Sequence, residues 1–403
     1  MSEFKYILRK RGEKGSASVA ATSLPIAETA QRFHAGFEGY AYTPLRRLDA
    51  LANKLGVGQI FVKDESYRFG LNAFKALGGG FAIGQYLAQT LGKPIDELSF
   101  AELTSDAVRK QLGEVTFVTA TDGNHGRGVA WMANKLRQKA VVYMPKGSAA
   151  ERLDNILKEH ADASITDMNY DGAVHLAQRN ADKNGWVLMQ DTAWDGYEQI
   201  PTWIMQGYLT LSYEIYRQLE EMKAMKPTHL ILQAGVGSFA SSVLGFFTAL
   251  YGDERPITVI VEPEKAACLY KSALANDGQV HFVTGDMNTI MAGLACGEPS
   301  TVSYRIIDAY ADAFVTCDDE VAAEGMRMLG NPIKDDVQII SGESGAVPAG
   351  LLREIMRNQK LAELREKLGF DKDSRVLLIS TEGDTDRENY RRIVWDGQNP
   401  SEE

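Results

Sequence analysis

A lysine beside a glycine cluster is the first residue of this sequence whose surroundings could support chemistry. Lys75 lies in the segment NAFKALGGG, at the expected start of a helix and next to Phe74, Ala76 and Leu77. Apolar neighbours disfavour the charged form of an amine, and a helix N-terminus disfavours it further, so the amine becomes nucleophilic. Most lysines are simply solvated, which is the alternative for this one. The apolar setting favours a lysine that forms a Schiff base.

A turn rich in small residues follows, between an expected strand and an expected helix. In TATDGNHG, from Thr119 to Gly126, backbone N–H groups at the start of the helix could bind a carboxylate or a phosphate, assisted by the helix dipole. Thr121 or Asp122 could instead cap the helix. His125 taken alone is more simply a packed, hydrogen-bonded histidine than a ligand.

A glycine-rich loop later in the chain has the pattern of a phosphate-binding site. The segment GVGSFA, at 235–240, follows the expected strand HLILQ and precedes an apolar helix. It also matches G-x-G-x-x-A with Glu262 at the end of the next strand, as in dinucleotide-binding units. This segment alone favours NAD, but such a unit leaves Lys75 and the TDGNHG turn without a role. The loop therefore predicts a phosphate without deciding which cofactor carries it.

Polar residues also stand where other elements are expected to end. Ser380 and Thr381 close one strand, where hydroxyls either face the ligand crevice of a parallel sheet or satisfy the loop backbone. Asp191 closes the strand WVLMQ, a position where aspartate commonly caps a helix or forms a turn. Glu343, in the turn SGESGA, could line the same crevice, and the sequence assigns it no role.

The elements that must position these residues alternate along the chain. Short β-branched runs are separated by helical patterns of about 10 to 15 residues, which implies parallel sheets flanked by helices. Strands are expected in GQIFVK, EVTFVT, KAVVYM, ASITDM, WVLMQ, HLILQ, ITVIVEP, ADAFVTC and SRVLLIS. Helices are expected at about 72–91, 123–138, 152–160, 173–183, 197–222 and from 238 onward.

The domain organisation is expected to be a smaller domain inserted into a larger one. A length of 403 residues favours two domains. The segment 92–114 is charged and lacks a strong apolar period, so it could be an insertion or cover loop near a domain edge. We expect the small domain at 86–195 and a large domain formed by 1–85 and 196–403.

Composition excludes several classes of protein. Apolar residues make up 44% and charged residues 24%, which is ordinary for a globular chain. A formal net charge of −11 provides no field that attracts nucleic acid or an anionic membrane, and no apolar run approaches the length of a membrane span. Cys268, Cys296 and Cys317 are scattered and odd in number, which argues against a zinc site. Without an apolar signal segment, we expect a cytoplasmic protein with no metal site.

Taken in order, the motifs resemble those of the fold type II pyridoxal-phosphate enzymes, which include the threonine and serine dehydratases, the cysteine synthases and the tryptophan synthase β chain. The resemblance covers about 42–385 and implies an α/β fold with two doubly wound, mostly parallel sheets. Within this family, NAFKALGG, TDGNHGRG and ISTEGDTD are similar to segments of the diaminopropionate ammonia-lyases. The dehydratases have a serine where this chain has Ala73 and a small residue where it has Asp122. Both departures weigh against dehydration of serine or threonine.

The resemblance implies a role for each motif, with pyridoxal 5'-phosphate as the cofactor. Lys75 would carry the Schiff base and Asn124 would hydrogen-bond the phenolic oxygen. Thr381 would face the pyridine nitrogen as a neutral hydroxyl, which leaves a weak electron sink and favours prompt elimination. Thr121 and the helical turn after it would bind the substrate carboxylate. Loop N–H groups would hold the phosphate at Gly235, Val236, Gly237 and Ser238.

Two aspartates complete the implied reaction, which removes ammonia from D- and L-2,3-diaminopropionate and yields aminoacrylate, then pyruvate and a second ammonia. The α-hydrogens of the two enantiomers point to opposite faces, so one base cannot reach both. The resemblance gives Asp122 as the base for the D isomer and Asp191 as the base for the L isomer. Asp122 beside the substrate also suits its second amine. A general base needs a raised pKa, which Trp194 and Trp203 could supply as apolar neighbours.

Three alternatives stay open on the sequence. The first is a serine or threonine dehydratase of the same fold, and the second is an NAD-dependent dehydrogenase built on residues 235–262. The third is a binding or regulatory module, which would not need Lys75, Asn124 and the glycine loop. The family further implies a homodimer that binds a small amino-acid substrate and neither nucleic acid nor membrane.

Overall fold

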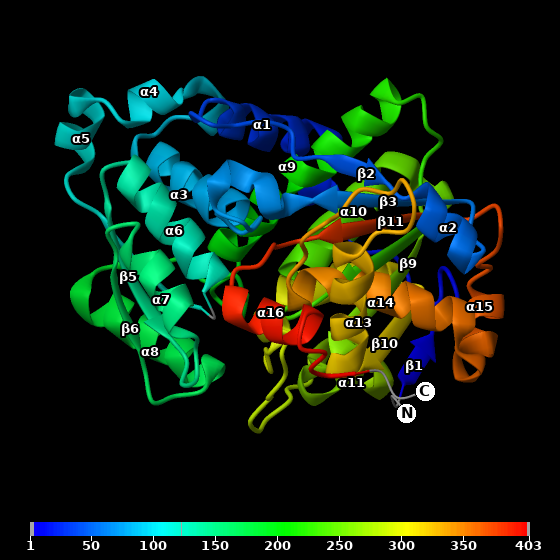
Figure 1. Ribbon diagram of the computed structural model, residues 1–403. Helices are drawn as coiled ribbons and strands as arrows, with labels where there is room; N and C mark the ends of the chain where they lie inside the picture. Colours follow the sequence, from blue (N-terminus) through cyan, green and yellow to red (C-terminus); the bar gives the residue numbers. More distant parts are fainter. Residues whose placement is uncertain (1–3, 122, 401–403) are drawn as a thin grey trace.

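Two β-sheets organise the computed structural model, which describes residues 4–121 and 123–400 (Figure 1). The larger sheet has seven strands in the order β1-β10-β9-β8-β11-β3-β2. Its central strands are parallel, and β1 and β2 pair antiparallel at its two edges. The strands of this sheet are β1 Lys5–Leu8, β2 Leu45–Arg47, β3 Gln59–Asp64, β8 His229–Gln233, β9 Ile257–Pro263, β10 Ala313–Cys317 and β11 Arg375–Ser380.

The smaller sheet has four parallel strands in the order β6-β5-β4-β7. Strand β7 is short because, beyond Leu188, the side chain of Gln190 takes the place of backbone atoms in hydrogen bonding to β4. The Gln190 Oε1 atom accepts hydrogen bonds from the Ala120 N–H and the Thr119 hydroxyl, each at 3.0 Å. The strands are β4 Thr116–Ala120, β5 Lys139–Met144, β6 Asp162–Ile165 and β7 Val187–Leu188.

Helices cover both faces of the large sheet, because side chains alternate across each strand. In β8, Leu230 and Leu232 belong to one apolar cluster and Ile231 to the opposite one. The first face is covered by α1 Leu24–Ala35, α9 Gln199–Glu221, α10 Ser238–Tyr251, α11 Cys268–Ala275 and α12 Thr301–Tyr310. The second face is covered by α2 Asp49–Leu55, α13 Asp319–Gly330, α14 Glu343–Arg357, α15 Ala362–Lys367 and α16 Arg387–Val394.

Helix α3, Ala76–Thr90, connects the packing of the two sheets, since it lies against α9 on one side and α6, Asn124–Lys135, on the other. The glycine cluster after Lys75 makes this close packing possible. A Cβ atom on Gly78 would lie 2.5 Å from the Tyr208 ring, and one on Gly207 would lie 2.4 Å from a backbone oxygen of α3. The remaining helices of the small sheet region are α4 Phe100–Leu103, α5 Asp106–Leu112, α7 Ala150–Leu157 and α8 Tyr170–Asn184.

The strands expected from the sequence are all present as β3 to β11, and the prediction of parallel sheets flanked by helices is confirmed. The sequence reading missed β1 and β2, which are short edge strands. The charged segment 92–114 contains α4 and α5, and within residues 4–40 strand β1 extends the large sheet while α1 packs on α9. The domain limits stay a prediction. The strands of the small sheet lie within 86–195, and α3 crosses residue 86.

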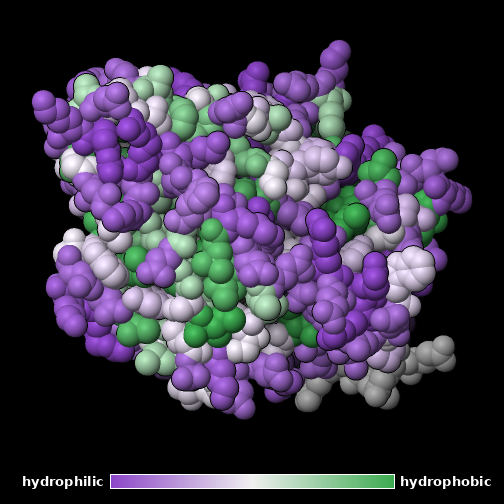
Figure 2. All heavy atoms as spheres, turned by 60° about the vertical axis from the view of Figure 1, so that its left-hand side comes forward, coloured by the Kyte–Doolittle hydropathy of each residue, from purple (hydrophilic) through white to green (hydrophobic). Residues whose placement is uncertain are grey.

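One face of the molecule is drawn in Figure 2 and is largely hydrophilic. Figure 2 shows polar side chains over most of the visible face, with apolar residues gathered near its middle. Among residues 4–121 and 123–400, no helix combines the length and the apolar character needed to cross a bilayer.

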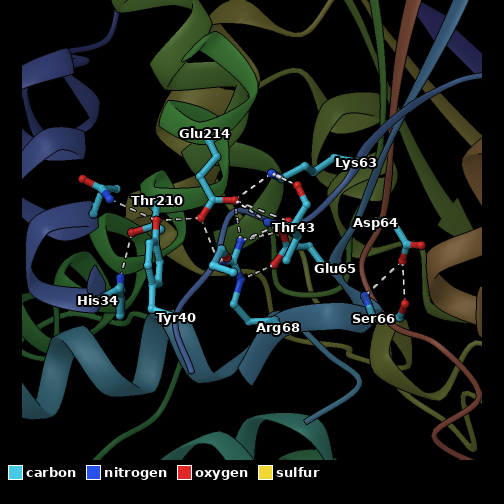
Figure 3. Close-up of polar contacts among 12 residues, drawn as sticks. His34, Tyr40, Thr43, Lys63, Asp64, Glu65, Ser66, Arg68, Thr210 and Glu214 are labelled. Atoms are coloured by element: carbon cyan, nitrogen blue, oxygen red, sulfur yellow. Dashed lines mark hydrogen bonds and ion pairs between the residues drawn. The ribbon is translucent and has the colours of Figure 1, made fainter. Parts of the chain in front are cut away.

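A buried group of charges fixes the turn that leads to Lys75. In Figure 3, Glu214 of α9 lies between Lys63 of β3 and Arg68 of the short helix η2, Glu65–Gly70. The Glu214 carboxylate lies 2.6 Å from the Lys63 ammonium and 2.7 Å from the Arg68 guanidinium. Arg68 also binds Glu65 at 2.8 Å, and all four side chains are at most 1% exposed. Each charge is therefore paired, as burial requires.

We expect Glu214→Gln to lower the free energy of unfolding by about 3–5 kcal/mol, because it leaves two buried cations with one carboxylate. Urea denaturation would measure the loss. The matched control is Glu220→Gln on the same helix, whose ion pair with Arg217 is about half exposed. The control should change stability by at most about 1 kcal/mol. Equal, small losses in both variants would show that the buried charges do not hold this turn.

Candidate active site

One cavity lies where the carboxyl ends of the parallel strands of both sheets meet, the place where α/β proteins bind ligands. Its walls come from the segments after β3, β4, β7, β8 and β11 and from the loop at 293–296. The site residues predicted from the sequence that line it are Lys75, Asn124, Asp191, Gly235, Val236, Gly237, Ser238 and Thr381.

The segment that carries Lys75 is tied by its backbone to the end of β11. The Phe74 N–H donates to the Thr381 carbonyl at 3.1 Å, and the Gly383 N–H donates to the Asn72 carbonyl at 3.0 Å. Asn72 has a φ of 61°, a left-handed conformation that asparagine tolerates better than most residues. These contacts hold Lys75 and Thr381 in the same cavity although they are far apart in the sequence.

Asp191 forms an ion pair with Lys75. The Asp191 Oδ2 atom lies 2.9 Å from the Lys75 Nζ atom, and the Asp191 side chain is 3% exposed. Burial raises the pKa of this carboxyl, but the charge and hydrogen bond of Lys75, together with the nearby His125, outweigh burial and lower the pKa to about 2. The expectation of a raised pKa is therefore wrong for Asp191. Neither Trp194 nor Trp203 lines this cavity, so the apolar neighbours that the sequence suggested are not there.

The glycine loop presents unpaired backbone donors to the cavity. It runs from the end of β8 into α10, and Gly237 has a φ of 100°, a conformation open to glycine. Within the described part of the chain, none of the N–H groups of residues 235–240 has an acceptor. The Ser238 hydroxyl donates to the Asp191 carbonyl at 2.5 Å. The loop therefore has the donors and the helix N-terminus that a phosphate group needs.

The polar cavity residues that the sequence reading missed include Gln233, Ser344 and Glu382. Glu382 accepts a hydrogen bond from the Asn124 amide at 2.5 Å and one from the Ser344 N–H at 3.3 Å. Gln233, the last residue of β8, donates to the Thr381 hydroxyl oxygen at 3.0 Å. Gln233 and Glu382 directly adjoin predicted motifs, so their position at strand ends was an available signal.

The turn before α6 has the contacts of a helix cap. The Thr121 hydroxyl oxygen accepts hydrogen bonds from the Gly123 N–H at 2.9 Å and the Gly126 N–H at 3.0 Å. Thr121 does not line the cavity, and its contact with the substrate carboxylate stays a prediction. His125 is buried with its Nε2 atom 2.7 Å from a backbone carbonyl, as expected of a packed histidine. Asp122 lies outside the described residues.

Glu262 is used inside the protein and cannot bind a nucleotide ribose. The side chain is 1% exposed, and its carboxylate accepts hydrogen bonds from the N–H groups of Leu269 and Tyr270 at 2.8 and 2.7 Å. These are residues of the first turn of α11, so Glu262 stabilises that helix. The dinucleotide interpretation of residues 235–262 is therefore wrong.

Glu343 lies in a second, outer cavity between the two sheets. This cavity also contains Arg152, Tyr170 and Asn389 in its walls. The Asn389 amide donates to Glu343 at 2.5 Å. Burial and the nearby Glu382 carboxylate raise the pKa of Glu343 to about 7. Glu343 therefore does not line the cavity that contains Thr381, which was the crevice the sequence suggested, but the outer one.

Comparisons with known proteins agree with this site. The family model of the pyridoxal-phosphate dependent enzymes matches residues 37–382. The diaminopropionate ammonia-lyase of Salmonella typhimurium is 53% identical over 397 residues, which cover 98% of each chain. The holo crystal structure of the diaminopropionate ammonia-lyase of Escherichia coli has a TM-score of 0.92 and 49% identity, and covers 99% of this chain and 98% of that one.

A second crystal structure of the Escherichia coli enzyme contains an aminoacrylate–pyridoxal-phosphate azomethine reaction intermediate. It superposes with a TM-score of 0.90 and 48% identity over 99% of both chains. The family match spans most of the sequence, and the identity to the curated relative holds over nearly all of it. This chain therefore belongs to the fold type II pyridoxal-phosphate dependent enzymes and, within them, to the diaminopropionate ammonia-lyases.

Proposed function

We propose that this protein eliminates ammonia from D- and L-2,3-diaminopropionate with pyridoxal 5'-phosphate as its cofactor. The observation that carries the proposal is the convergence of Lys75, Asn124, Thr381 and the loop at 235–238 on one cavity. The relatives described above support the substrate.

The donors in the cavity fit this cofactor. Pyridoxal phosphate has acceptors at its phosphate, its phenolic oxygen and its ring nitrogen. The loop supplies N–H groups without other acceptors in the described chain, Asn124 supplies an amide and Thr381 a hydroxyl. Lys75 supplies the one amine in the cavity wall that can bind the aldehyde carbon covalently. The donor set therefore matches the chemical groups that it would have to hold.

When bound, the cofactor supplies a sink for the electron pair that remains after an α-proton is removed. Lys75 would hold it through its amine, and the loop residues Gly235, Val236, Gly237 and Ser238 would bind its phosphate. Asn124 and Thr381 would supply hydrogen bonds to its phenolic oxygen and its ring nitrogen.

Binding of the substrate is assigned to the small sheet side of the cavity. Thr121 and the first turn of α6 would bind the α-carboxylate, because a helix N-terminus favours an anion. A second ammonium group distinguishes diaminopropionate from serine and threonine. Asp122 is proposed to favour that ammonium by its charge.

Proton removal is assigned to Asp122 for the D isomer and to Asp191 for the L isomer. The Asp191 carboxylate is a weak base while the Lys75 ammonium lies beside it, since the pKa is then about 2. Asp191 can accept a proton only when Lys75 is uncharged, because burial alone raises the pKa of a carboxyl. The ion pair thus makes the basicity of Asp191 depend on the charge of Lys75. The released aminoacrylate hydrolyses to pyruvate and ammonia.

We also propose that the enzyme is a cytoplasmic homodimer. The support is the fold type II family, together with a net charge of −11 and only three cysteines in 403 residues. Light scattering would measure the molar mass in solution.

The proposed function is tested by pyruvate formation from D- and L-2,3-diaminopropionate, with L-serine and L-threonine assayed beside them. We expect turnover of both diaminopropionate enantiomers with two ammonia released per pyruvate. Turnover restricted to serine or threonine would instead make the protein a dehydratase, and no keto acid from any of the four would contradict an elimination of this kind.

Lys75→Ala is the control for this assay. It should remove the visible absorption of the bound cofactor and abolish turnover, because no other residue on the cavity wall offers an amine. A visible band like that of the unsubstituted enzyme would show that the lysine assignment is wrong.

The two-base scheme predicts opposite effects for two substitutions. Asp122→Asn should lower kcat/KM for the D isomer by at least about 100-fold and spare the L isomer, and Asp191→Asn should do the reverse, since a general base typically contributes 10²–10⁴-fold. Steady-state kinetics with each enantiomer would measure both. Equal losses on the two isomers in either variant would contradict one base per enantiomer. Retention of the visible cofactor band would show that Asp191→Asn leaves Lys75 functional.

A further inference from the structure

Gln233 lies in the wall of the cavity, at the carboxyl end of the central strand β8, and it is 2% exposed. Its Nε2 atom donates to the Ile379 carbonyl at 2.9 Å and to the Thr381 hydroxyl oxygen at 3.0 Å. Both acceptors belong to the end of β11. An amide NH₂ group has two hydrogens, so both are used by this segment.

The direction of these hydrogen bonds is fixed by the Ile379 carbonyl. A carbonyl oxygen only accepts, so the Gln233 atom that contacts it must be the amide nitrogen. Rotating the amide by half a turn would place the Oε1 atom against that carbonyl oxygen. In the observed orientation Oε1 is buried without a donor among the described residues. The orientation is therefore set by the contacts to Ile379 and Thr381.

Thr381 must consequently use its own hydrogen elsewhere. Its oxygen accepts from Gln233, and the single hydroxyl hydrogen has no acceptor in the described part of the chain. Because Thr381 lines the cavity, that hydrogen is available to a ligand inside it. A hydroxyl committed in this way acts as a hydrogen-bond donor, and its natural partner is an acceptor.

We propose that Gln233 is a positioning residue that fixes the Thr381 hydroxyl as a donor and thereby keeps the cofactor ring nitrogen unprotonated. The proposal rests on the proposed function, which places pyridoxal phosphate in this cavity with its ring nitrogen at Thr381. An unprotonated nitrogen accepts the hydroxyl hydrogen. A protonated nitrogen would need the second lone pair of Thr381 and would leave the hydroxyl hydrogen buried without an acceptor, which costs free energy.

Gln233→Glu reverses the polarity of the contact with Thr381 and gives up the hydrogen bond to the Ile379 carbonyl, to which a carboxylate cannot donate. A carboxylate only accepts, so the Thr381 hydroxyl would donate to residue 233 and offer its lone pairs to the ring. A ring nitrogen beside such an acceptor is stabilised in its protonated form. We therefore expect the proton affinity of the ring nitrogen to rise by about tenfold or more, which is one pKa unit.

The test is ¹⁵N NMR of the holoenzyme reconstituted with pyridoxal phosphate labelled at the ring nitrogen. The unsubstituted enzyme should give the shift of an unprotonated pyridine nitrogen, and Gln233→Glu should move it toward the protonated value. Gln233→Met removes both donors without adding a charge, so it should move the ¹⁵N shift in the same direction but by less. This variant provides the test if the Glu variant does not fold. A shift unchanged by both substitutions would overturn the proposal.

A double variant separates positioning from a direct effect of charge. In a Thr381→Val background the hydroxyl is absent, so Gln233→Glu should no longer change the ¹⁵N shift. A shift that still moves in this background would show that residue 233 does not act through Thr381. The proposed function is judged separately on the unsubstituted enzyme. If that enzyme binds no labelled cofactor, both proposals fail. If it turns over diaminopropionate but its ¹⁵N shift does not respond to substitution of Gln233, only this inference is overturned.

Discussion

The ion pair between Lys75 and Asp191 is the contact on which the site depends. Lys75 directly precedes α3, in the segment after strand β3 of the large sheet, and Asp191 follows β7 of the small sheet. A buried carboxylate must be paired, so this contact favours the two sheets being held with their carboxyl ends together. Ser238, which donates to the Asp191 carbonyl, brings the glycine loop to the same point. Lys75, Asp191 and the loop therefore depend on one another for position.

Rigid support behind the lysine comes from two kinds of packing. The charges around Glu214 fix the turn before Lys75 on α9, while glycines let α3 lie close against the same helix. The backbone of the lysine segment is bonded to the end of β11, so Thr381 moves with it. The parallel topology alone brings strand ends to one edge, and these contacts convert that edge into a defined cavity.

Much of the fold was predictable because buried parallel strands and amphipathic helices have clear sequence periods. That Lys75, Asn124 and the loop at 235–238 would line one cavity was predictable, because each stands in a short local motif at the end of an expected strand. The pKa direction of Asp191 was not, because it depends on a lysine 116 residues away. The charges around Glu214 were missed for the same reason, since each partner alone is an ordinary helix or strand residue. In the sequence, Gln233 is only the last residue of an expected strand. Its hydrogen bonds to Ile379 and Thr381 become visible only once β11 is placed beside β8.

The cavity is arranged as an inner layer of donors supported by acceptors. Asn124 is oriented by the Glu382 carboxylate and Lys75 by that of Asp191, so each carboxylate holds a donor in place. At Thr381 the supporting group is the neutral amide of Gln233, which donates. Under the proposed function, in which Thr381 faces the ring nitrogen of the cofactor, a carboxylate at position 233 would turn the hydroxyl around and stabilise a protonated ring. The neutral amide would then stand where the proposed reaction needs a weak electron sink, since a weak sink favours elimination over reactions that need a longer-lived carbanion.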